Sequence, residues 1–203
     1  MEGMIYMIRK RKMSGLIIAV LLTILLTGCS ELSDFPKSGV EVSEDQSITA
    51  VIMEDFSADY YQMEELIQFV NEDIQSYNAE VGSNVVSIGD YSLDNGIITL
   101  QLDFENHDAY NGYMPEEVFV GNLQGAYDKG YNFDRTLYVA GKGDDIIVKE
   151  DLLNMGNAKV VVITGDLCVR CPSKILYYST GMTLIDDQTV SADSEGNYFI
   201  IYK

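Results

Sequence analysis

Two cysteines three residues apart carry the strongest chemical signal in the body of the chain. Cys168 and Cys171 lie in the sequence Cys-Val-Arg-Cys-Pro and follow an apolar stretch that predicts a strand. This spacing is typical of a redox dithiol when a helix begins at the pair, because a helix N-terminus lowers the thiol pKa. The residues that follow, 174–179, are β-branched and aromatic and predict a strand instead. Three interpretations stay open: a local disulfide, two free thiols, or a redox pair.

The other candidates for catalysis or metal binding lack their partner residues. His107 is the only histidine, and no Gly-x-Ser-x-Gly elbow accompanies it toward a Ser–His–Asp triad. A zinc site would need two ligands besides the cysteine pair, and one histidine cannot supply them. Acidic pairs occur at 144–145 and 186–187 and at Asp193 with Glu195, but their spacing is not that of a calcium loop. We therefore predict no catalytic residue and no metal site.

Tyrosines, which include Tyr60 and Tyr61 and gather between residues 110 and 131, hint at a ligand surface. The chain contains 14 Tyr, 7 Phe and no Trp. Half-exposed tyrosine rings can line a groove for a carbohydrate or a peptide, although half-buried sheet and helix positions also accommodate them. The binding residues that this pattern predicts are Tyr110, Tyr113, Tyr127 and Tyr131.

The N-terminus has the three parts of a secretory signal peptide. Residues 9–12 are all basic, residues 16–26 are almost wholly apolar, and Leu26-Thr27-Gly28-Cys29 follows. The apolar run is shorter than the roughly 20 residues that a membrane-spanning helix needs. The tetrapeptide resembles a bacterial lipobox, at which a signal peptidase cuts and the cysteine thiol receives a diacylglyceryl group. This resemblance implies a palmitate-type lipoprotein on the extracytoplasmic face of the cell membrane, with the lipid on Cys29 as its only attached group.

Three stretches of the mature chain support a second resemblance. They are ITAVIMEDFSADYY, FVGNLQGAYDKGYNF and KILYYSTGMTLID. Together they look like small lipoproteins of clostridial gut bacteria. The resemblance implies a Gram-positive membrane surface, brings no assigned activity and carries over no catalytic residue. Cys168 and Cys171 are not part of it.

The charge of the chain narrows the classes of partner. Thirteen basic and 32 acidic residues give 13 − 32 = −19, and removal of residues 1–28 leaves 9 − 31 = −22. Such a surface repels nucleic acid and anionic lipid. We therefore expect the bilayer as a partner through Cys29, together with an unknown envelope protein or small ligand, and no nucleic acid.

The expected elements are one long helix and several hairpins. Apolar residues from Met63 to Tyr77 recur at helical spacing, and Gly82 lies beyond their end. Asp94-Asn95-Gly96 between two apolar runs predicts a hairpin turn. A short helix is expected within 118–129, and residues 106–117 are predicted to be irregular. Strands are expected at 48–53, 85–93, 97–104, 136–140, 159–164, 174–179, 182–185 and 198–202.

Because these helices and strands do not alternate, we predict an α+β fold: a single domain with a largely antiparallel sheet packed with one long and one or two short helices. The expected organisation is a signal peptide at 1–28, a lipid-anchored flexible tether at 29–47 and an extracytoplasmic domain at 48–203. We interpret the domain as a binding or interaction module at the cell envelope. The alternative is an envelope enzyme, either a thiol–disulfide oxidoreductase that uses Cys168 and Cys171 or a hydrolase with unidentified acids.

Overall fold

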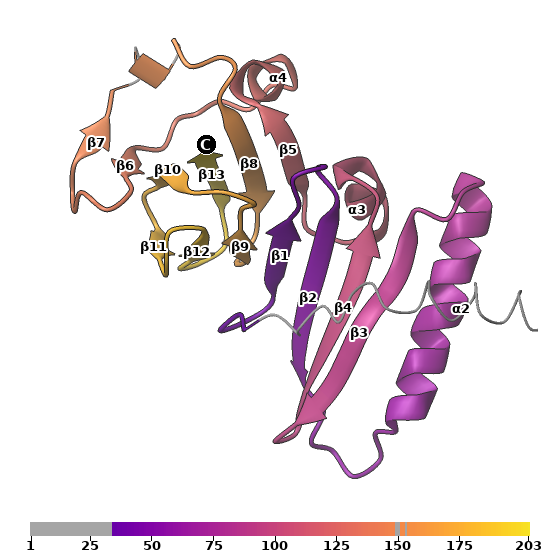
Figure 1. The fold of residues 1–203 in the computed structure, drawn as a ribbon. Helices are drawn as coiled ribbons and strands as arrows, with labels where there is room; N and C mark the ends of the chain where they lie inside the picture. Colours follow the sequence, from indigo (N-terminus) through magenta and orange to yellow (C-terminus); the bar gives the residue numbers. More distant parts are fainter. Residues whose placement is uncertain (1–33, 149–150, 153) are drawn as a thin grey trace, which may run out of the picture. The chain divides into compact units, whose positions relative to one another are not determined.

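The computed structural model describes residues 34–148, 151–152 and 154–203, which form thirteen strands in two sheets and three helices (Figure 1). The first sheet, sheet A, contains, from edge to edge, β11 (Met182–Leu184), β12 (Thr189–Ala192), β9 (Cys168–Arg170), β1 (Gly39–Val42), β2 (Ile48–Asp55), β4 (Ile97–Phe104) and β3 (Val86–Asp94). The second, sheet B, contains β5 (Val118–Asn122), β8 (Lys159–Thr164), β13 (Asn197–Tyr202), β10 (Ile175–Ser179), β6 (Leu137–Val139) and β7 (Ile146–Ile147). The helices are α2 (Met63–Val81), α3 (His107–Tyr113) and α4 (Leu123–Asp128).

The predicted α+β fold class is wrong, because the described chain is mostly β and its strands form two sheets. The predicted strands are present, but five further strands (β1, β5, β7, β9 and β12) complete the two sheets. The long helix α2 begins at Met63, the first of the residues whose helical spacing predicted it, and Gly82 ends it with a φ of 82°. It contributes little to the core, however, since Ile74 is its only buried residue.

Between residues 106 and 129 one local prediction is wrong and another is confirmed only in part. The stretch predicted to be irregular contains α3, because the Asn106 side chain accepts hydrogen bonds from the amides of Asp108 and Ala109 and caps a short helix. The short helix expected within 118–129 is present as α4, but residues 118–122 form β5, which pairs with β8 along its whole length. The pairing partner of this stretch lies about forty residues away in sequence, so local propensity does not reveal it.

An apolar layer between the sheets holds the fold together. It joins one face of sheet A, including Val40, Ile48 and Leu102, to one face of sheet B, including Val161 and Ile200. The opposite face of sheet B is buried as well. Its residues form a second apolar layer with α4: Phe119, Leu123, Ala126, Phe133, Leu137, Leu152, Val160, Val162, Phe199 and Ile201. The central strands β8 and β13 are therefore apolar at successive positions, as strands covered on both faces must be.

The prediction of a flexible tether at 29–47 is wrong for the described part of that range, which begins at residue 34. Residues 29–33, with Cys29 and the signal peptide, lie outside the described residues. Strand β1 pairs antiparallel with β2 and parallel with β9, so it lies inside sheet A. The segment before it is fixed too. Phe35 is buried against Val51 and Cys168, and Arg170 lies over its ring with Cζ 4.8 Å from the ring centroid.

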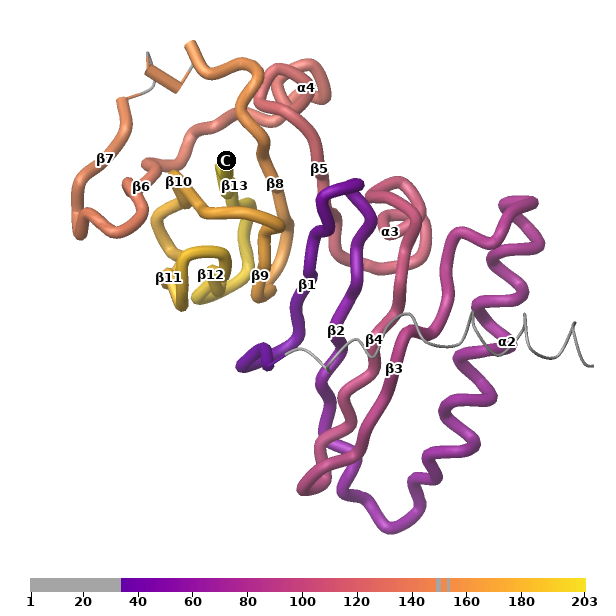
Figure 2. The backbone as a smooth tube through the Cα atoms, viewed as in Figure 1, coloured from indigo at the N-terminus to yellow at the C-terminus, as the bar shows by residue number. Residues whose placement is uncertain are grey.

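The ends of three strands extend beyond the two-sheet body. Strand β2 pairs with β1 only as far as Val51, but it continues beside β4 to the pair Asp55–Ile97. The tight turn at Asn95 and Gly96, both with positive φ, connects β4 to β3 and confirms the predicted hairpin. We call residues 52–100, which contain these strand ends and α2, the protruding hairpin (the lower right of Figures 1 and 2). No strand of sheet B pairs with it.

The contact between β1 and β9 provides a test of this architecture. A Cβ on Gly39 would lie 2.8 Å from Cβ of Cys168, so we expect Gly39→Ala to destabilise the fold by about 1–3 kcal/mol through overpacking. Urea unfolding followed by circular dichroism measures this change. Gly156→Ala is the matched control, because the nearest atoms to a Cβ there are 3.9 Å away. Equal stability of the two variants would contradict the placement of β1 inside the sheet.

Candidate functional site

The cysteine pair does not form a redox site or a disulfide in this structure. Both residues are free thiols. Cys168 lies in β9 and Cys171 directly after it in extended chain. Three residues of extended chain span roughly 10 Å, beyond the reach of a disulfide. Successive strand residues also point to opposite faces, so Cys168 packs on Phe35 whereas Cys171 lies in the layer between the sheets.

The surroundings of both thiols suppress their reactivity. Cys168 and Cys171 have 0% and 1% of their surface exposed. Burial raises the pKa of Cys168 to about 11, and the charges of Lys37 and Arg170 oppose this shift only in part. Burial raises the pKa of Cys171 further, well above the ordinary value of a thiol. Since the thiolate is the reactive form, the structure favours two buried free thiols among the three predicted interpretations.

His107 and the acidic pairs also have structural roles. His107 begins α3, with its ring 5.2 Å from that of Phe119 and its Nε2 3.6 Å from a carboxylate oxygen of Asp108. Burial lowers the pKa of this histidine. Asp186 accepts a hydrogen bond from the Gln188 amide and stabilises a turn. Among residues 34–148, 151–152 and 154–203, no three His, Cys, Asp or Glu side chains gather closely enough to hold a metal ion.

The four tyrosines predicted to bind a ligand are packing residues in two separate layers. Tyr110 and Tyr113 belong to the layer between the sheets, where the ring of Tyr110 lies 5.2 Å from that of Phe104. Tyr127 and Tyr131 pack in the layer beneath α4. Burial raises the pKa of all four hydroxyls. The structure therefore places them in two separate layers and does not bring all four together as one set.

Exposed apolar side chains gather instead on the protruding hairpin. Of the ten large hydrophobic residues that are exposed in the described chain, seven lie between residues 60 and 97: Tyr60, Tyr61, Phe69, Val81, Tyr91, Leu93 and Ile97. Three of them, Tyr91, Leu93 and Ile97, belong to β3 and β4, and the other four belong to α2 and the loop before it. Exposed apolar groups that are concentrated in one region mark an interaction site more reliably than the same groups scattered singly.

Aromatic rings cluster in the loop between β2 and α2. The rings of Phe56 and Tyr61 stack with centroids 4.8 Å apart, and Tyr60 meets Tyr61 edge-on at 4.7 Å. The Phe56 amide donates to the carbonyl of Gly96, which holds the loop beside the turn of the hairpin. The loop therefore presents its rings next to the exposed strand ends.

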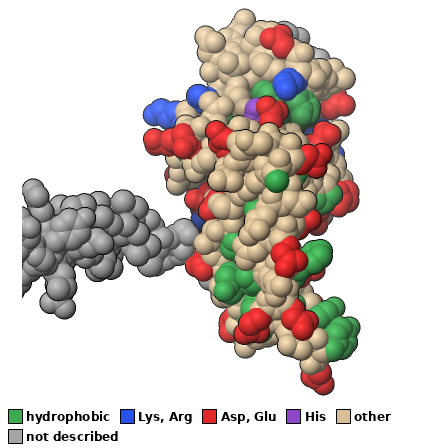
Figure 3. Space-filling model, turned by 90° about the vertical axis from the view of Figure 1, so that its right-hand side faces the viewer, with side chains coloured by type: hydrophobic (Ala, Val, Ile, Leu, Met, Phe, Trp, Pro, Cys, Tyr) green, Lys and Arg blue, Asp and Glu red, His purple; other side chains and the backbone are tan. Residues whose placement is uncertain are grey.

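This region carries negative charge only. Residues 38–128 contain 19 Asp and Glu and no Lys or Arg, so every basic residue of the described chain belongs to other segments. Figure 3 shows the consequence: on the lower part of the face in view, hydrophobic side chains lie among carboxylates and no basic side chain appears. The surface combines apolar area with uncompensated carboxylates.

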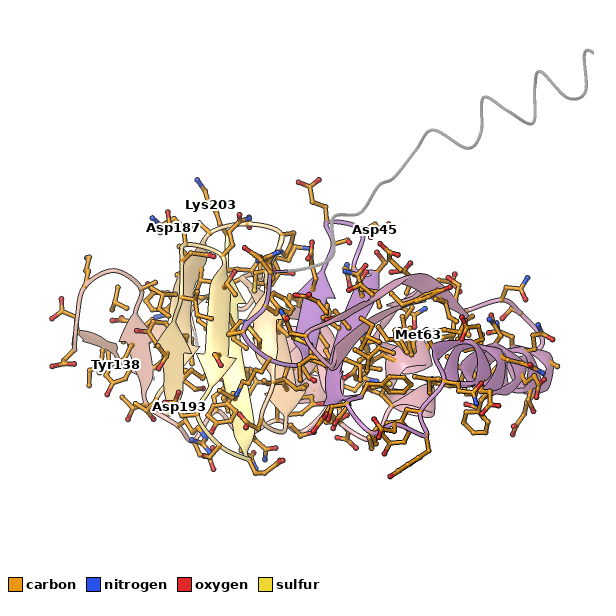
Figure 4. All side chains as sticks on the ribbon, turned by 90° about the horizontal axis from the view of Figure 1, so that it is seen from below. Asp45, Met63, Tyr138, Asp187, Asp193 and Lys203 are labelled. Carbon is orange, nitrogen blue, oxygen red and sulfur yellow. The ribbon has the colours of Figure 1, made fainter. Side chains whose placement is uncertain are left out.

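A groove runs along α2 on the side of β3. It has a volume of about 690 Å³ and is lined by Met63, Glu64, Ile67, Gln68, Asn71, Glu72, Gln75 and Tyr91. Met63, at the start of α2, is labelled in Figure 4, at the opposite end of the domain from Tyr138 in β6. Apolar groups of α2 and β3 contribute to the lining together with two carboxylates. We take the groove, the aromatic loop and the exposed ends of β3 and β4 as the candidate site, and call it the acidic surface.

Sequence reasoning missed the acidic surface, although one signal for it was present. The 91 residues without a basic side chain can be read directly from the sequence. The exposure of Tyr91 and Leu93 cannot, because alternating apolar residues in a hairpin are normally covered by the core.

The comparisons with known proteins leave the site to be interpreted from its geometry. No protein-family model matches the chain, and no curated protein and no solved structure matches it either. No helix in residues 34–148, 151–152 and 154–203 combines the length and the apolar character needed to cross a bilayer.

The state of the thiols can be measured directly. In the native full-length protein at pH 8 we expect iodoacetamide to leave Cys168 and Cys171 unmodified, because both are buried and their pKa values are raised. In 6 M guanidinium chloride both should react without prior reduction. Peptide mapping by mass spectrometry reports each residue separately. A disulfide-linked peptide, or rapid labelling of either native thiol, would restore the redox interpretation.

Proposed function

We propose that the chain is a membrane-anchored extracytoplasmic lipoprotein whose domain binds a positively charged protein at the cell envelope through the acidic surface. The observation that carries the binding part is the coincidence of exposed apolar side chains with a segment that has no basic residue. The lipobox-like Leu26-Thr27-Gly28-Cys29 supports the anchor, and the diacylglyceryl group on Cys29 would be the only attached group.

The position of Asp34, the first described residue, constrains how the anchor would hold the domain. Five peptide units separate Cys29 from Asp34, so the connection reaches at most about 17 Å at roughly 3.5 Å per residue. Asp34 binds Arg170, and Lys37 binds Asp166 and the carbonyl of Ala192. With these contacts in place, a lipid on Cys29 would keep the domain close to the membrane rather than on a long tether.

A positively charged protein fits the acidic surface better than two other occupants. An anionic membrane would be repelled by the carboxylates around the exposed rings. A second copy of the chain would bring two surfaces of the same negative sign together, which costs free energy at close approach. Aromatic anchors with a polar, solvent-accessible rim are, in contrast, common in protein-binding surfaces, and carboxylates in such a rim favour a basic partner.

The alternative of an envelope enzyme loses its main support. Its oxidoreductase form needs a reactive dithiol, and the two thiols are buried on opposite faces of sheet A. The hydrolase alternative depends on acidic residues that the sequence does not identify. The geometry of the described chain does not favour a particular set of acidic residues as catalytic.

The anchor can be tested in a Gram-positive host. We expect the wild-type protein to incorporate radiolabelled palmitate and Cys29→Ser to incorporate none, because only Cys29 follows the lipobox-like sequence. Cys171→Ser is the control and should keep the label. Gel autoradiography of the immunoprecipitated protein measures it. Equal labelling of the wild type and Cys29→Ser would rule out the anchor.

The binding surface can be tested with two matched triple variants. The probe is a twelve-residue peptide of alternating lysine and valine, added to the full-length protein in detergent. The first variant combines Tyr61→Ser, Tyr91→Ser and Leu93→Ser, at positions that are 46%, 44% and 48% exposed. It should bind the peptide about tenfold more weakly or worse, since apolar contact area is lost. The control variant combines Ile146→Ser, Val148→Ser and Ile185→Ser, at positions that are 54%, 50% and 47% exposed, and should leave the affinity for the peptide unchanged.

Fluorescence anisotropy of the labelled peptide gives both affinities, and circular dichroism verifies that each variant is folded. Absence of binding to the wild type, or an equal loss in both triple variants, would contradict the proposed surface.

A further inference from the structure

Strand β3 lies at the end of sheet A, and β4 is its only partner strand in the described chain. Its other edge faces the groove beside α2, to which Tyr91 of β3 contributes. Natural sheets usually protect such an edge by bulges, charges or a covering element, because its amides and carbonyls can pair with another chain. The orientation of these groups in β3 decides whether the edge is available.

At the start of β3, a side chain of α2 takes the place of a neighbouring strand. The Asn78 amide nitrogen donates to the Val86 carbonyl at 2.8 Å, and its oxygen accepts from the Val86 amide at 3.1 Å. A hydrogen-bonded residue of an adjacent strand would make the same two contacts. The amide and carbonyl of Val86 therefore point away from β4, and by the alternation of an antiparallel ladder those of Ile88 do so as well.

At the far end of β3, the turn determines the same orientation. Asp94 and Ile97 flank a two-residue turn and form its closing hydrogen-bonded pair. Alternation then directs the backbone groups of Leu93 and Tyr91 away from β4. The register shift between Ile88 and Tyr91 reconciles the two ends. The Tyr91 amide donates to the Asp90 carboxylate at 2.8 Å, which agrees with this orientation.

The open edge is thus only partly protected. Asn78 occupies the groups of Val86, and Asp90 occupies the amide of Tyr91. The backbone groups of Ile88 and Leu93 remain directed outward along the described edge. Asn78 shows that a hydrogen-bonding partner fits at this edge.

The side chains along the edge indicate what kind of chain would bind. Tyr91 and Leu93 lie on the face of the sheet that contains the buried Leu100 and Ile98, their cross-strand partners. The groove on this side has apolar contacts from Met63 and Ile67, and carboxylates from Glu64 and Glu72. A lysine or arginine can place its aliphatic stem on such a floor and its charged group beside the carboxylates.

We propose that an extended, lysine- or arginine-containing segment of a partner protein adds to sheet A as a new strand along β3, with its basic side chains in the groove beside α2. The proposal rests on the proposed function, because it specifies how the acidic surface recognises its partner. Main-chain hydrogen bonds to the groups of Ile88 and Leu93 hold the segment, and Glu64 and Glu72 select its charge. An acidic segment of the same length is excluded by repulsion.

Backbone-modified peptides separate strand addition from attraction of charge alone. The probe is the alternating lysine–valine peptide, with two further versions that carry N-methyl groups on every lysine or on every valine. Each version keeps the charge and loses the amides that point to one edge of the strand. At least one version should bind the wild-type full-length protein about tenfold more weakly than the parent peptide, because it loses several hydrogen bonds.

A substitution in the edge gives an independent test. Leu93→Pro removes an amide that does not bond to β4, so the hairpin should stay folded while strand addition weakens about tenfold. Leu93→Thr is the control, because it shortens the side chain and keeps the amide; it should reduce affinity less than Leu93→Pro. Circular dichroism establishes that both variants are folded. If Leu93→Pro does not fold, the N-methylated peptides still decide the question.

The outcomes distinguish the two proposals. Weaker binding of an N-methylated peptide together with a selective loss in Leu93→Pro supports strand addition. Equal binding of all three peptides to the wild type overturns strand addition and leaves the acidic surface as an electrostatic and apolar binding site. No binding of any lysine–valine peptide overturns both proposals.

Discussion

The apolar layer between the two sheets is the interaction on which the rest of the structure depends. It buries one face of sheet A and one face of sheet B, and the largest buried side chains of the domain, among them Tyr110, Tyr198 and Phe104, lie in it. Burial of apolar area is the dominant favourable contribution to folding. Beyond sheet B the layer continues between sheet A and α2, through Leu100 and Ile74, but it leaves Tyr91 and Leu93 of β3 and Ile97 of β4 exposed. The candidate site therefore lies at the part of sheet A that α2 covers incompletely.

The N-terminal segment adds a second constraint on the domain. Strand β1 joins β2 to β9, so the seven strands of sheet A form one sheet only when residues 39–42 are in place. Phe35 covers Cys168 on the outer face, and Arg170 interacts with Asp34 and Glu41 around it. The residues nearest the proposed lipid anchor are thus part of the fold. In this account, the position of the domain at the membrane and the integrity of sheet A depend on the same segment.

Local signals in the sequence predicted individual elements but not their assembly. The helical spacing after Met63 and the Asn95-Gly96 turn act within a few residues, and both predictions are confirmed. Strand β1 was missed because its four residues are stabilised by pairing with β9, about 130 residues away. The cysteine spacing was ambiguous for a related reason, since a pair three residues apart faces one way in a turn and opposite ways in a strand. The order of helices and strands in the sequence does not show how the strands divide into two sheets or which faces of those sheets pack together. The fold class therefore could not be derived from the element order.

The separation of charge gives the domain two different halves. Residues 38–128 contain no Lys or Arg, and the lysine and arginine partners of the ion pairs in the described residues, Lys37, Arg170 and Lys174, lie outside that segment, although Arg170 pairs with Glu41 within it. We regard the body as the scaffold and the protruding hairpin as the part that meets the partner.

Hydrogen–deuterium exchange of the full-length protein, with and without the lysine–valine peptide, tests this account most directly. The account predicts that the amides of Ile88 and Leu93 exchange rapidly in the free protein and become protected by the peptide. Amides of the opposite edge strand β11 should be unaffected. Protection at β11 or in sheet B, with none along β3, would contradict the assignment of the protruding hairpin as the binding surface.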